Sequence, residues 1–235
     1  MEHIELKISL LQTDTIYRDF KANLSQAEIM ISKALNRRKK PNVLVLPAIL
    51  AAGSNEQEAA AVNQLQKLAA QNSVNIVTSC TFDTAYAVDR QGHIIASCNQ
   101  ANEMQPESCI FDLDGISCGI IPGCDLRFPE VVRQSALKGA KVLFVLGKWP
   151  KLREIHWKLL NIVRAIENQF FVVAVNSAGK PRTGACSGMS MVVDPWGKIL
   201  AESDESPEIL TTVIDVGLVE RARGQNPVLN DITAN

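Results

Sequence analysis

Strand-like apolar runs alternate with helical periodicity in both halves of the chain, and this order limits the folds available to it. The first half predicts helices over 17–37 and 55–71 and strands over 4–11, 42–46, 74–79, 85–89, 93–97, 108–113 and 117–121. The second half predicts helices over 128–137 and 150–169 and strands over 141–146, 170–176, 187–194, 199–202 and 210–215. Two strand-rich halves that each carry helices indicate an α/β fold, with two sheets packed face to face and helices outside.

Two local patterns add detail to this prediction. The sequences DRQG (89–92), DLDG (112–115) and DPWG (194–197) each join two apolar runs, and an Asp that opens a turn closed by Gly is typical of a hairpin. The helix over 150–169 carries an apolar stripe, the pattern of a helix that packs against a core. The stripe consists of Leu152, Ile155, Leu159, Ile162 and Ile166.

Composition and charge exclude several classes of protein. The 235 residues are 46% hydrophobic and 21% charged, and the formal net charge of −1 gives no reason to expect a nucleic acid or an anionic membrane as partner. No apolar run approaches the roughly 20 residues of a membrane span, and the first residues lack the features of a secretory signal. We therefore expect a cytoplasmic protein without a membrane segment.

The cysteines and histidines indicate neither a metal site nor a cofactor. The six cysteines form no CxxC pair, and the three histidines are scattered along the chain. Most of the cysteines are expected to be reduced and buried.

The segment PGCDLRFPE (122–130) is the most informative motif. It resembles the nucleophile segment of the nitrilase, or carbon-nitrogen hydrolase, superfamily, whose amidase-like and ω-amidase-like members read CYDLRFPE. Three further segments are similar to that family: VLVLPAI (43–49), GKWPKLREIHWKLLNIVRAIENQFFVVAVNSAG (147–179) and GMSMVVDPWGKILAE (188–202). The resemblance covers nearly the whole chain. It implies a single domain over 1–235 with the four-layer α-β-β-α sandwich of the nitrilase type.

The resemblance also implies a Glu-Lys-Cys triad, and this chain departs from it at all three positions. In the family, a Cys thiolate attacks the substrate carbon, a Glu transfers the proton and a Lys stabilises the tetrahedral intermediate. The matching positions here hold Ala48, Gln100 and Gly123. A methyl group cannot carry a proton, and a neutral amide cannot lower the pKa of a thiol. Gly123 has a structural interpretation, because glycine adopts a strained turn without steric cost.

Other polar residues near these positions have competing interpretations. Cys124 is a nucleophile if the role has moved by one residue. The competing interpretation is an inert thiol, because consecutive side chains point in different directions and Cys124 would not take the place of residue 123. Lys148 is a candidate for contact with an anionic ligand. Glu103 or Glu107 is a candidate for the second Glu of the family. The alternative is that each is a solvated carboxylate in a loop. The three charged residues of DLRFPE are interpreted as groups that cap or pair at the start of the next helix: Asp125, Arg127 and Glu130.

Three functions remain open. The sequence favours a homologue that has lost catalysis and binds a small amide or carboxylate, or a partner, over an active enzyme. The first alternative is an amide-bond hydrolase of the ω-amidase type that acts through Cys124 or another arrangement. The second is a structural subunit of an active paralogue. By resemblance to the family, the protein is expected to form a homodimer.

Overall fold

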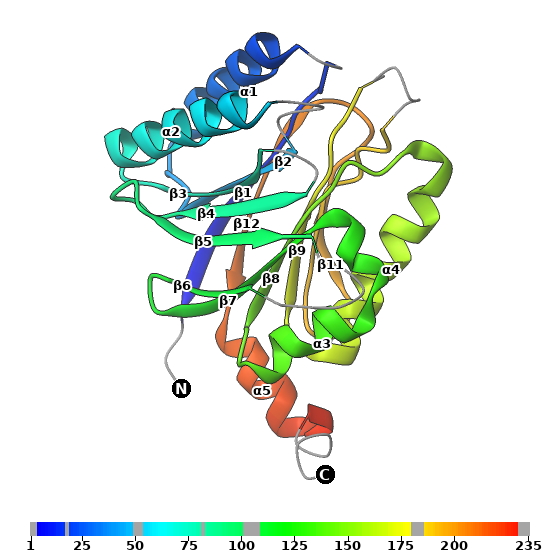
Figure 1. Ribbon diagram of the computed structural model, residues 1–235. Coiled ribbons are helices and arrows are strands. Elements are labelled where there is room, and N and C mark those ends of the chain that lie inside the picture. The colour runs from blue at the N-terminus through cyan, green and yellow to red at the C-terminus, as the bar shows by residue number, and fades with distance from the viewer. Residues whose placement is uncertain are drawn as a thin grey trace.

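Two six-stranded mixed sheets lie at the centre of the computed structural model, which describes residues 4–16, 19–48, 54–80, 83–100, 109–179 and 186–229 (Figure 1). The first sheet has the order β12-β1-β2-β3-β4-β5 and consists of β1 (Glu5–Gln12), β2 (Val43–Ala48), β3 (Asn75–Ser79), β4 (Thr84–Val88), β5 (Ile94–Asn99) and β12 (Glu208–Asp215). The second has the order β11-β10-β9-β8-β7-β6 and consists of β6 (Cys109–Leu113), β7 (Ile116–Pro122), β8 (Val142–Leu146), β9 (Phe171–Val175), β10 (Met191–Val193) and β11 (Ile199–Glu202).

The parallel strands lie in the middle of each sheet, and the antiparallel strands lie toward the edges. Strands β1, β2 and β3 pair in parallel, as do β7, β8 and β9. Every residue of β2, β8 and β9 is buried. This burial explains their continuous apolar sequences, because a parallel strand is covered on both faces.

Helices cover the outer face of each sheet (Figure 1). Helices α1 (Phe20–Leu35) and α2 (Asn55–Asn72) pack on the first sheet, and α3 (Pro129–Leu137) and α4 (Glu154–Asn168) pack on the second. A third apolar cluster fills the space between the sheets, with Leu10 and Val45 from one sheet and Phe144 and Val173 from the other. The predicted α-β-β-α sandwich is therefore confirmed.

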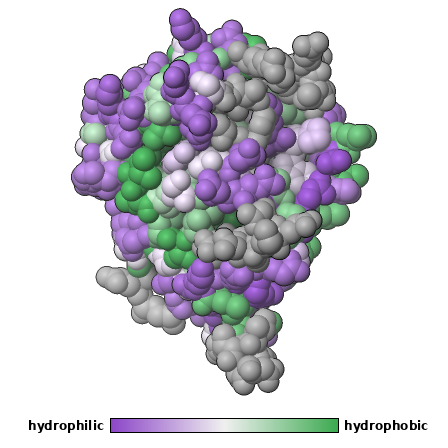
Figure 2. Space-filling model, in the orientation of Figure 1, coloured by the Kyte–Doolittle hydropathy of each residue, from purple (hydrophilic) through white to green (hydrophobic). Residues whose placement is uncertain are grey.

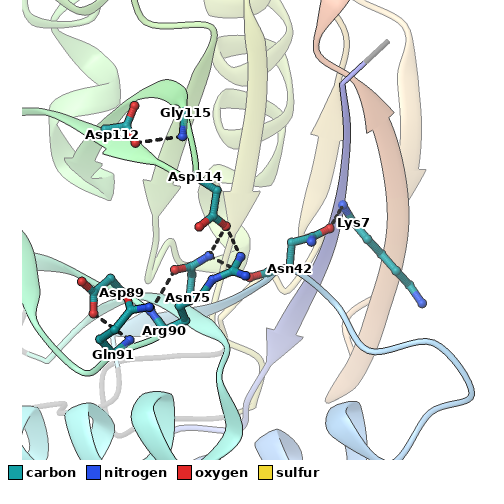
Figure 3. A network of polar contacts seen from close by, with 9 residues as sticks. All are labelled: Lys7, Asn42, Asn75, Asp89, Arg90, Gln91, Asp112, Asp114 and Gly115. Atoms are coloured by element: carbon teal, nitrogen blue, oxygen red, sulfur yellow. Dashed lines mark hydrogen bonds and ion pairs between the residues drawn. The ribbon is translucent and has the colours of Figure 1, made fainter. Parts of the chain in front are cut away.

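A polar network joins the two sheets at the turns (Figure 3). Asn75 Nδ2 donates to Asp114 Oδ2 at 2.7 Å and to the carbonyl oxygen of Asn42 at 3.0 Å. The backbone N–H of Arg90 donates to Asn75 Oδ1 at 3.1 Å, and the Arg90 guanidinium forms an ion pair with Asp114. Because Asp114 belongs to the β6–β7 turn and Asn75 begins β3, these bonds fix the second sheet against the first.

The turn predictions agree with the structure. Asp89 Oδ1 accepts hydrogen bonds from the backbone N–H groups of Gln91 and His93, and Asp194 Oδ1 accepts the equivalent pair from Trp196 and Lys198. Each of these Asp residues thus stabilises the turn that it opens.

The main correction concerns the apolar stripe predicted over 150–169, because four of its five residues point away from the core and Ile162 packs against it. Leu152 is 95% exposed, Ile155 66%, Leu159 55% and Ile166 50%. The buried face carries Trp157 together with polar side chains. The helical period was right, but the inference that the stripe packs against the core holds for Ile162 alone of its five residues.

Three smaller differences concern element boundaries. The helix predicted from 150 begins with a 3-10 turn (Lys151–Arg153), and the strand predicted over 187–194 is limited to Met191–Val193. The structure adds a 3-10 helix (Gly123–Arg127) and α5 (Gly217–Gln225), which the sequence did not predict. None of the helices among the described residues combines the length and apolar character that a bilayer crossing requires.

Two cysteines are bonded to each other. Cys98 of β5 and Cys109 of β6 form a disulfide with Cα atoms 5.7 Å apart, and it links neighbouring edges of the two sheets. The other four cysteines are free, so most are reduced, as expected. In the described ranges, no group of three or more His, Cys, Asp or Glu side chains is placed to hold a metal ion.

Candidate functional site

A pocket of about 320 Å³ opens where β2, β7 and β8 end. Five residues singled out from the sequence line it, although they come from four separate segments: Ala48, Gln100, Gly123, Cys124 and Lys148. The structure therefore brings Ala48, Gln100 and Gly123, the positions that the family resemblance assigns to the triad, together in one cavity. Glu103 and Glu107 lie outside the described residues.

The floor of the pocket is small and apolar. Ala48, the last residue of β2, is 2% exposed, and Leu146, the last residue of β8, is 3% exposed. Gln100 follows β5 and lies at the exposed rim, where its backbone N–H donates to the carbonyl oxygen of Asp83 at 2.6 Å. None of these three positions supplies a proton-transferring carboxylate to the pocket.

Gly123 is required by a close approach of two main chains. Its φ does not lie in the left-handed region, so the expectation that glycine relieves a strained turn was wrong. A Cβ atom at this position would lie 2.7 Å from Gly147 Cα and 2.9 Å from the carbonyl oxygen of Leu146. Those are backbone atoms, which cannot move aside as a flexible side chain can. The end of β8 therefore occupies the space that a side chain at residue 123 needs.

Cys124 is half-buried, and its environment disfavours the thiolate. Burial, followed by the negative charge of Asp125, raises the pKa of the Cys124 thiol to about 11. Near neutral pH, such a thiol stays protonated. Nucleophilic cysteines have the opposite environment, in which a base or a cation lowers the pKa.

A buried hydrogen-bonded chain fixes Trp149 in the wall of the pocket. Asn176 Oδ1 accepts a hydrogen bond from the backbone N–H of Trp149 at 2.7 Å, and the indole Nε1 donates to the carbonyl oxygen of Gly123 at 2.9 Å. Trp157 packs against the Trp149 ring with the ring centroids 5.8 Å apart. The indole therefore has a defined position.

Arg127 lies over Trp149 and lines the pocket, a role that the sequence did not predict. Its guanidinium carbon is 4.4 Å from the centroid of the Trp149 ring. The residue preceding α3 is Phe128, and no side chain caps that helix by a hydrogen bond, whereas Glu130 lies in its first turn, as the sequence predicted. Arg153 is a second pocket residue that was missed, and the basic residues around WP in GKWPKLR (147–153), after β8, were the available signal for it.

The RAIENQ motif (164–169), at the end of α4, forms hydrogen bonds with the 3-10 helix Gly123–Arg127. Arg164 is 5% exposed, and its Nε and Nη2 donate to the carbonyl oxygen of Leu126 at 3.2 and 3.0 Å. Its Nη1 also donates to Glu167 at 2.9 Å. These bonds hold the 3-10 helix that carries Gly123 and Cys124 against α4.

Lys148 is half-buried in the pocket. Burial lowers the pKa of its ammonium group, because removal from water disfavours the charged form. The pocket thus contains a cation whose hydration is incomplete.

Comparison with known proteins identifies the class to which this fold and pocket belong. Residues 103–224 match the family model described as carbon-nitrogen hydrolase. The chain belongs to this family.

Particular relatives cover nearly the whole chain. The 2-oxoglutaramate amidase of Bacillus subtilis is 35% identical over an alignment that covers 96% of this chain and 96% of its own. A protein of Staphylococcus aureus described as a hydrolase in the agr operon is 30% identical, over 97% of this chain and 98% of its own. The deaminated glutathione amidase of Escherichia coli O157:H7 is 28% identical, over 91% of this chain and 79% of its own.

Solved structures show the same fold. Saccharomyces cerevisiae Nit3, a member of branch 10 of the nitrilase superfamily, has a TM-score of 0.84 at 24% identity, with 95% of each chain covered. A carbon-nitrogen hydrolase from Helicobacter pylori G27 has a TM-score of 0.86 at 19% identity, over 97% of this chain and 95% of its own.

Proposed function

We propose that this member of the carbon-nitrogen hydrolase family does not hydrolyse amides and instead binds a small molecule in the pocket. One observation carries the proposal: Ala48, Gln100 and Gly123 line the same cavity, so the three departures occur where the family resemblance places one reaction. Without a base or a thiolate there, neither proton transfer nor covalent attack has an agent.

The surroundings of Gly123 and Cys124 support the same proposal. The backbone of Gly147 occupies the space of a side chain at 123, so the turn has adapted to glycine. The raised pKa of Cys124 leaves its neighbouring thiol protonated near neutral pH. The pocket itself remains open, and an open cavity lined by cations suits binding better than acyl transfer.

The second candidate function is an amide-bond hydrolase. The names of the chain's relatives favour this function, because the Bacillus subtilis protein is called a 2-oxoglutaramate amidase and aligns with nearly the whole chain. In this case Cys124, or a nucleophile in another arrangement, would replace the family thiol. The role of structural subunit of an active paralogue is a third candidate, favoured by the exposed face of α4.

An ammonia-release assay separates the first two candidates. The purified chain is incubated with 2-oxoglutaramate, glutaramate and succinamate, with the Bacillus subtilis relative as a positive control. We expect no release above the blank. Release that disappears in Cys124→Ala would establish the hydrolase, and release that survives in this variant would show another nucleophile.

We also infer that the protein forms a homodimer through the exposed stripe of α4. Four large apolar side chains, at 43% exposure or more, follow one another along this face: Ile155, Leu159, Val163 and Ile166. Figure 2 shows hydrophobic atoms at the edge of the molecule over α4. Exposed apolar surface of this kind favours association.

The cytoplasmic location expected from the sequence is also a proposal, and cell fractionation tests it.

A further inference from the structure

Three basic side chains line the pocket: Arg127, Lys148 and Arg153. No Asp or Glu among the described residues lines it with them. We propose that the pocket binds a small dicarboxylate whose acid groups are held by these three cations. This inference rests on the proposed function, because it names the ligand class of the same pocket.

The size and burial of the lining residues define the shape of the ligand. The cavity volume of about 320 Å³ lies at the lower end of the range for small-molecule sites, which is roughly 300–1,000 Å³. The floor, with Ala48 and Leu146, is apolar and buried, whereas Arg127 and Arg153 are exposed at the rim. A short aliphatic body therefore fits against the floor, and its acid groups lie toward the rim.

Arg127 is prepared to bind a carboxylate before the ligand arrives. Its guanidinium lies over the Trp149 ring, 4.4 Å from the centroid, and hydrogen bonds from Trp149 to Asn176 and Gly123 fix that ring. The N–H groups of a guanidinium lie in its plane, so contact with the ring through one face leaves them able to bind a carboxylate in bidentate fashion. A group that is already positioned loses less entropy on binding.

Lys148 gains more from an anion than an exposed lysine would. Burial lowers the pKa of its ammonium, so the charged form is disfavoured within the pocket. A carboxylate within ~4–6 Å reverses that effect. Lys148 therefore offers a carboxylate of the ligand a partly buried positive charge in the pocket.

Ala48, on the floor of the pocket, leaves room for a carboxylate of the ligand at the position where the family resemblance places a Glu. A carboxylate at residue 48 would repel a second carboxylate held nearby, but the methyl group of Ala48 does not. The negative charges of Asp125 and Asp83 act on Cys124 and raise its pKa. The ligand's acid groups therefore lie away from Cys124 and toward Lys148 and Arg153.

Calorimetric titration of matched ligands tests the dicarboxylate directly. Each pair keeps size and shape but differs by one charge: glutarate with glutaramate, and 2-oxoglutarate with 2-oxoglutaramate. The neutral diamide glutaramide completes the series. We expect the diacid to bind at least about tenfold more tightly than its monoamide, because one charge-assisted contact is lost in the amide.

Variants locate the binding in the pocket. Lys148→Gln and Arg127→Gln each remove one positive charge and should weaken diacid binding by about tenfold or more. Lys151→Gln removes the same charge from the neighbouring segment, where Lys151 forms an ion pair with Glu205, and should change the affinity by no more than about twofold.

The outcomes distinguish this inference from the proposed function. Diacid binding that is absent, or no tighter than that of the monoamide, overturns the dicarboxylate. Binding that is equal in Lys148→Gln, Arg127→Gln and the original chain also overturns it. Binding of glutaramide that is stronger than binding of the diacid would overturn the dicarboxylate as well, but it would agree with the proposed function of a non-catalytic binding pocket. Ammonia release, measured separately, would overturn the proposed function whatever the diacid does.

Discussion

The indole Nε1 of Trp149 donates a hydrogen bond to the carbonyl oxygen of Gly123 at 2.9 Å. This bond ties the turn after β7 to the segment after β8. The backbone of Leu146 and Gly147 packs against the same turn, so closely that residue 123 has no space for a Cβ atom. The position that the family resemblance assigns to the nucleophile is thus a packing contact between two main chains.

Gly123→Cys should destabilise the protein without creating activity. The new Cβ would lie 2.7 Å from Gly147 Cα, so the backbone must shift. We expect the free energy of unfolding to fall by about 1–3 kcal/mol, measured by urea denaturation. Gly224→Ala is the control, because a Cβ there meets no atom within 4 Å. A Gly123→Cys variant as stable as the original chain would contradict the close approach.

Alkylation of Cys124 should be slow near neutral pH. Burial and Asp125 raise the pKa of the thiol to about 11, so the thiolate fraction should still increase between pH 9 and pH 10. The rate of iodoacetamide labelling at Cys124, measured by peptide mass spectrometry, should therefore show no plateau by pH 10. Cys124→Ser identifies the peptide. A plateau below pH 8.5 would instead indicate an activated nucleophile.

Diacid binding should weaken at alkaline pH because of Lys148. The ligand attracts the ammonium form, whose pKa burial lowers below 10.5, so affinity is full below that lowered pKa and falls as pH rises through it. Burial raises the pKa values of the nearby Cys124 and Cys186 thiols, and the guanidinium groups stay charged. Titration calorimetry of glutarate should show the fall in the original chain. If the same fall occurs in Lys148→Gln, Lys148 is not its cause.

Asn75→Ala should loosen the contact between the two sheets. Asn75 is 1% exposed, and its side chain bonds to Asn42, Asp114 and Arg90. Three hydrogen bonds of a buried amide are lost, each with a net contribution of about 0.5–1.5 kcal/mol, so we expect a decrease of about 2 kcal/mol in the free energy of unfolding.

The control for that change is Asn63→Ala, on the exposed side of α2. It should shift stability by no more than about 0.5 kcal/mol, since Ala is a good helix former. Equal effects of the two substitutions, measured by urea denaturation, would show that the network contributes nothing specific.

A charged substitution in the α4 stripe should produce monomers. Ile155→Glu with Leu159→Glu places two carboxylates on the face that we infer to be the dimer interface. Light scattering should then report half the mass of the original protein. Ile29→Glu changes a side chain that is 51% exposed on α1 and should keep the dimer. An original chain that is already monomeric would refute the interface.

Most of the fold could be predicted because its signals are local. The continuous apolar run of β2 predicted a covered strand, and the Asp-to-Gly spacing predicted the hairpin turns. The family resemblance then supplied the order of the layers. In α4 the same kind of reasoning failed, because periodicity shows which side chains share a face but not what covers that face.

The sequence by itself determined which side chains are available: it placed Ala48, Gln100 and Gly123 at the positions that the family resemblance assigns to the base, the cation and the thiol. Only the tertiary structure decided what those positions became. It brought Gly123 against Gly147, raised the pKa of Cys124 by burial, and gathered Arg127, Lys148 and Arg153 around one cavity. The physical reason is that contact, burial and charge proximity depend on distances between segments far apart in the chain, which no local pattern encodes.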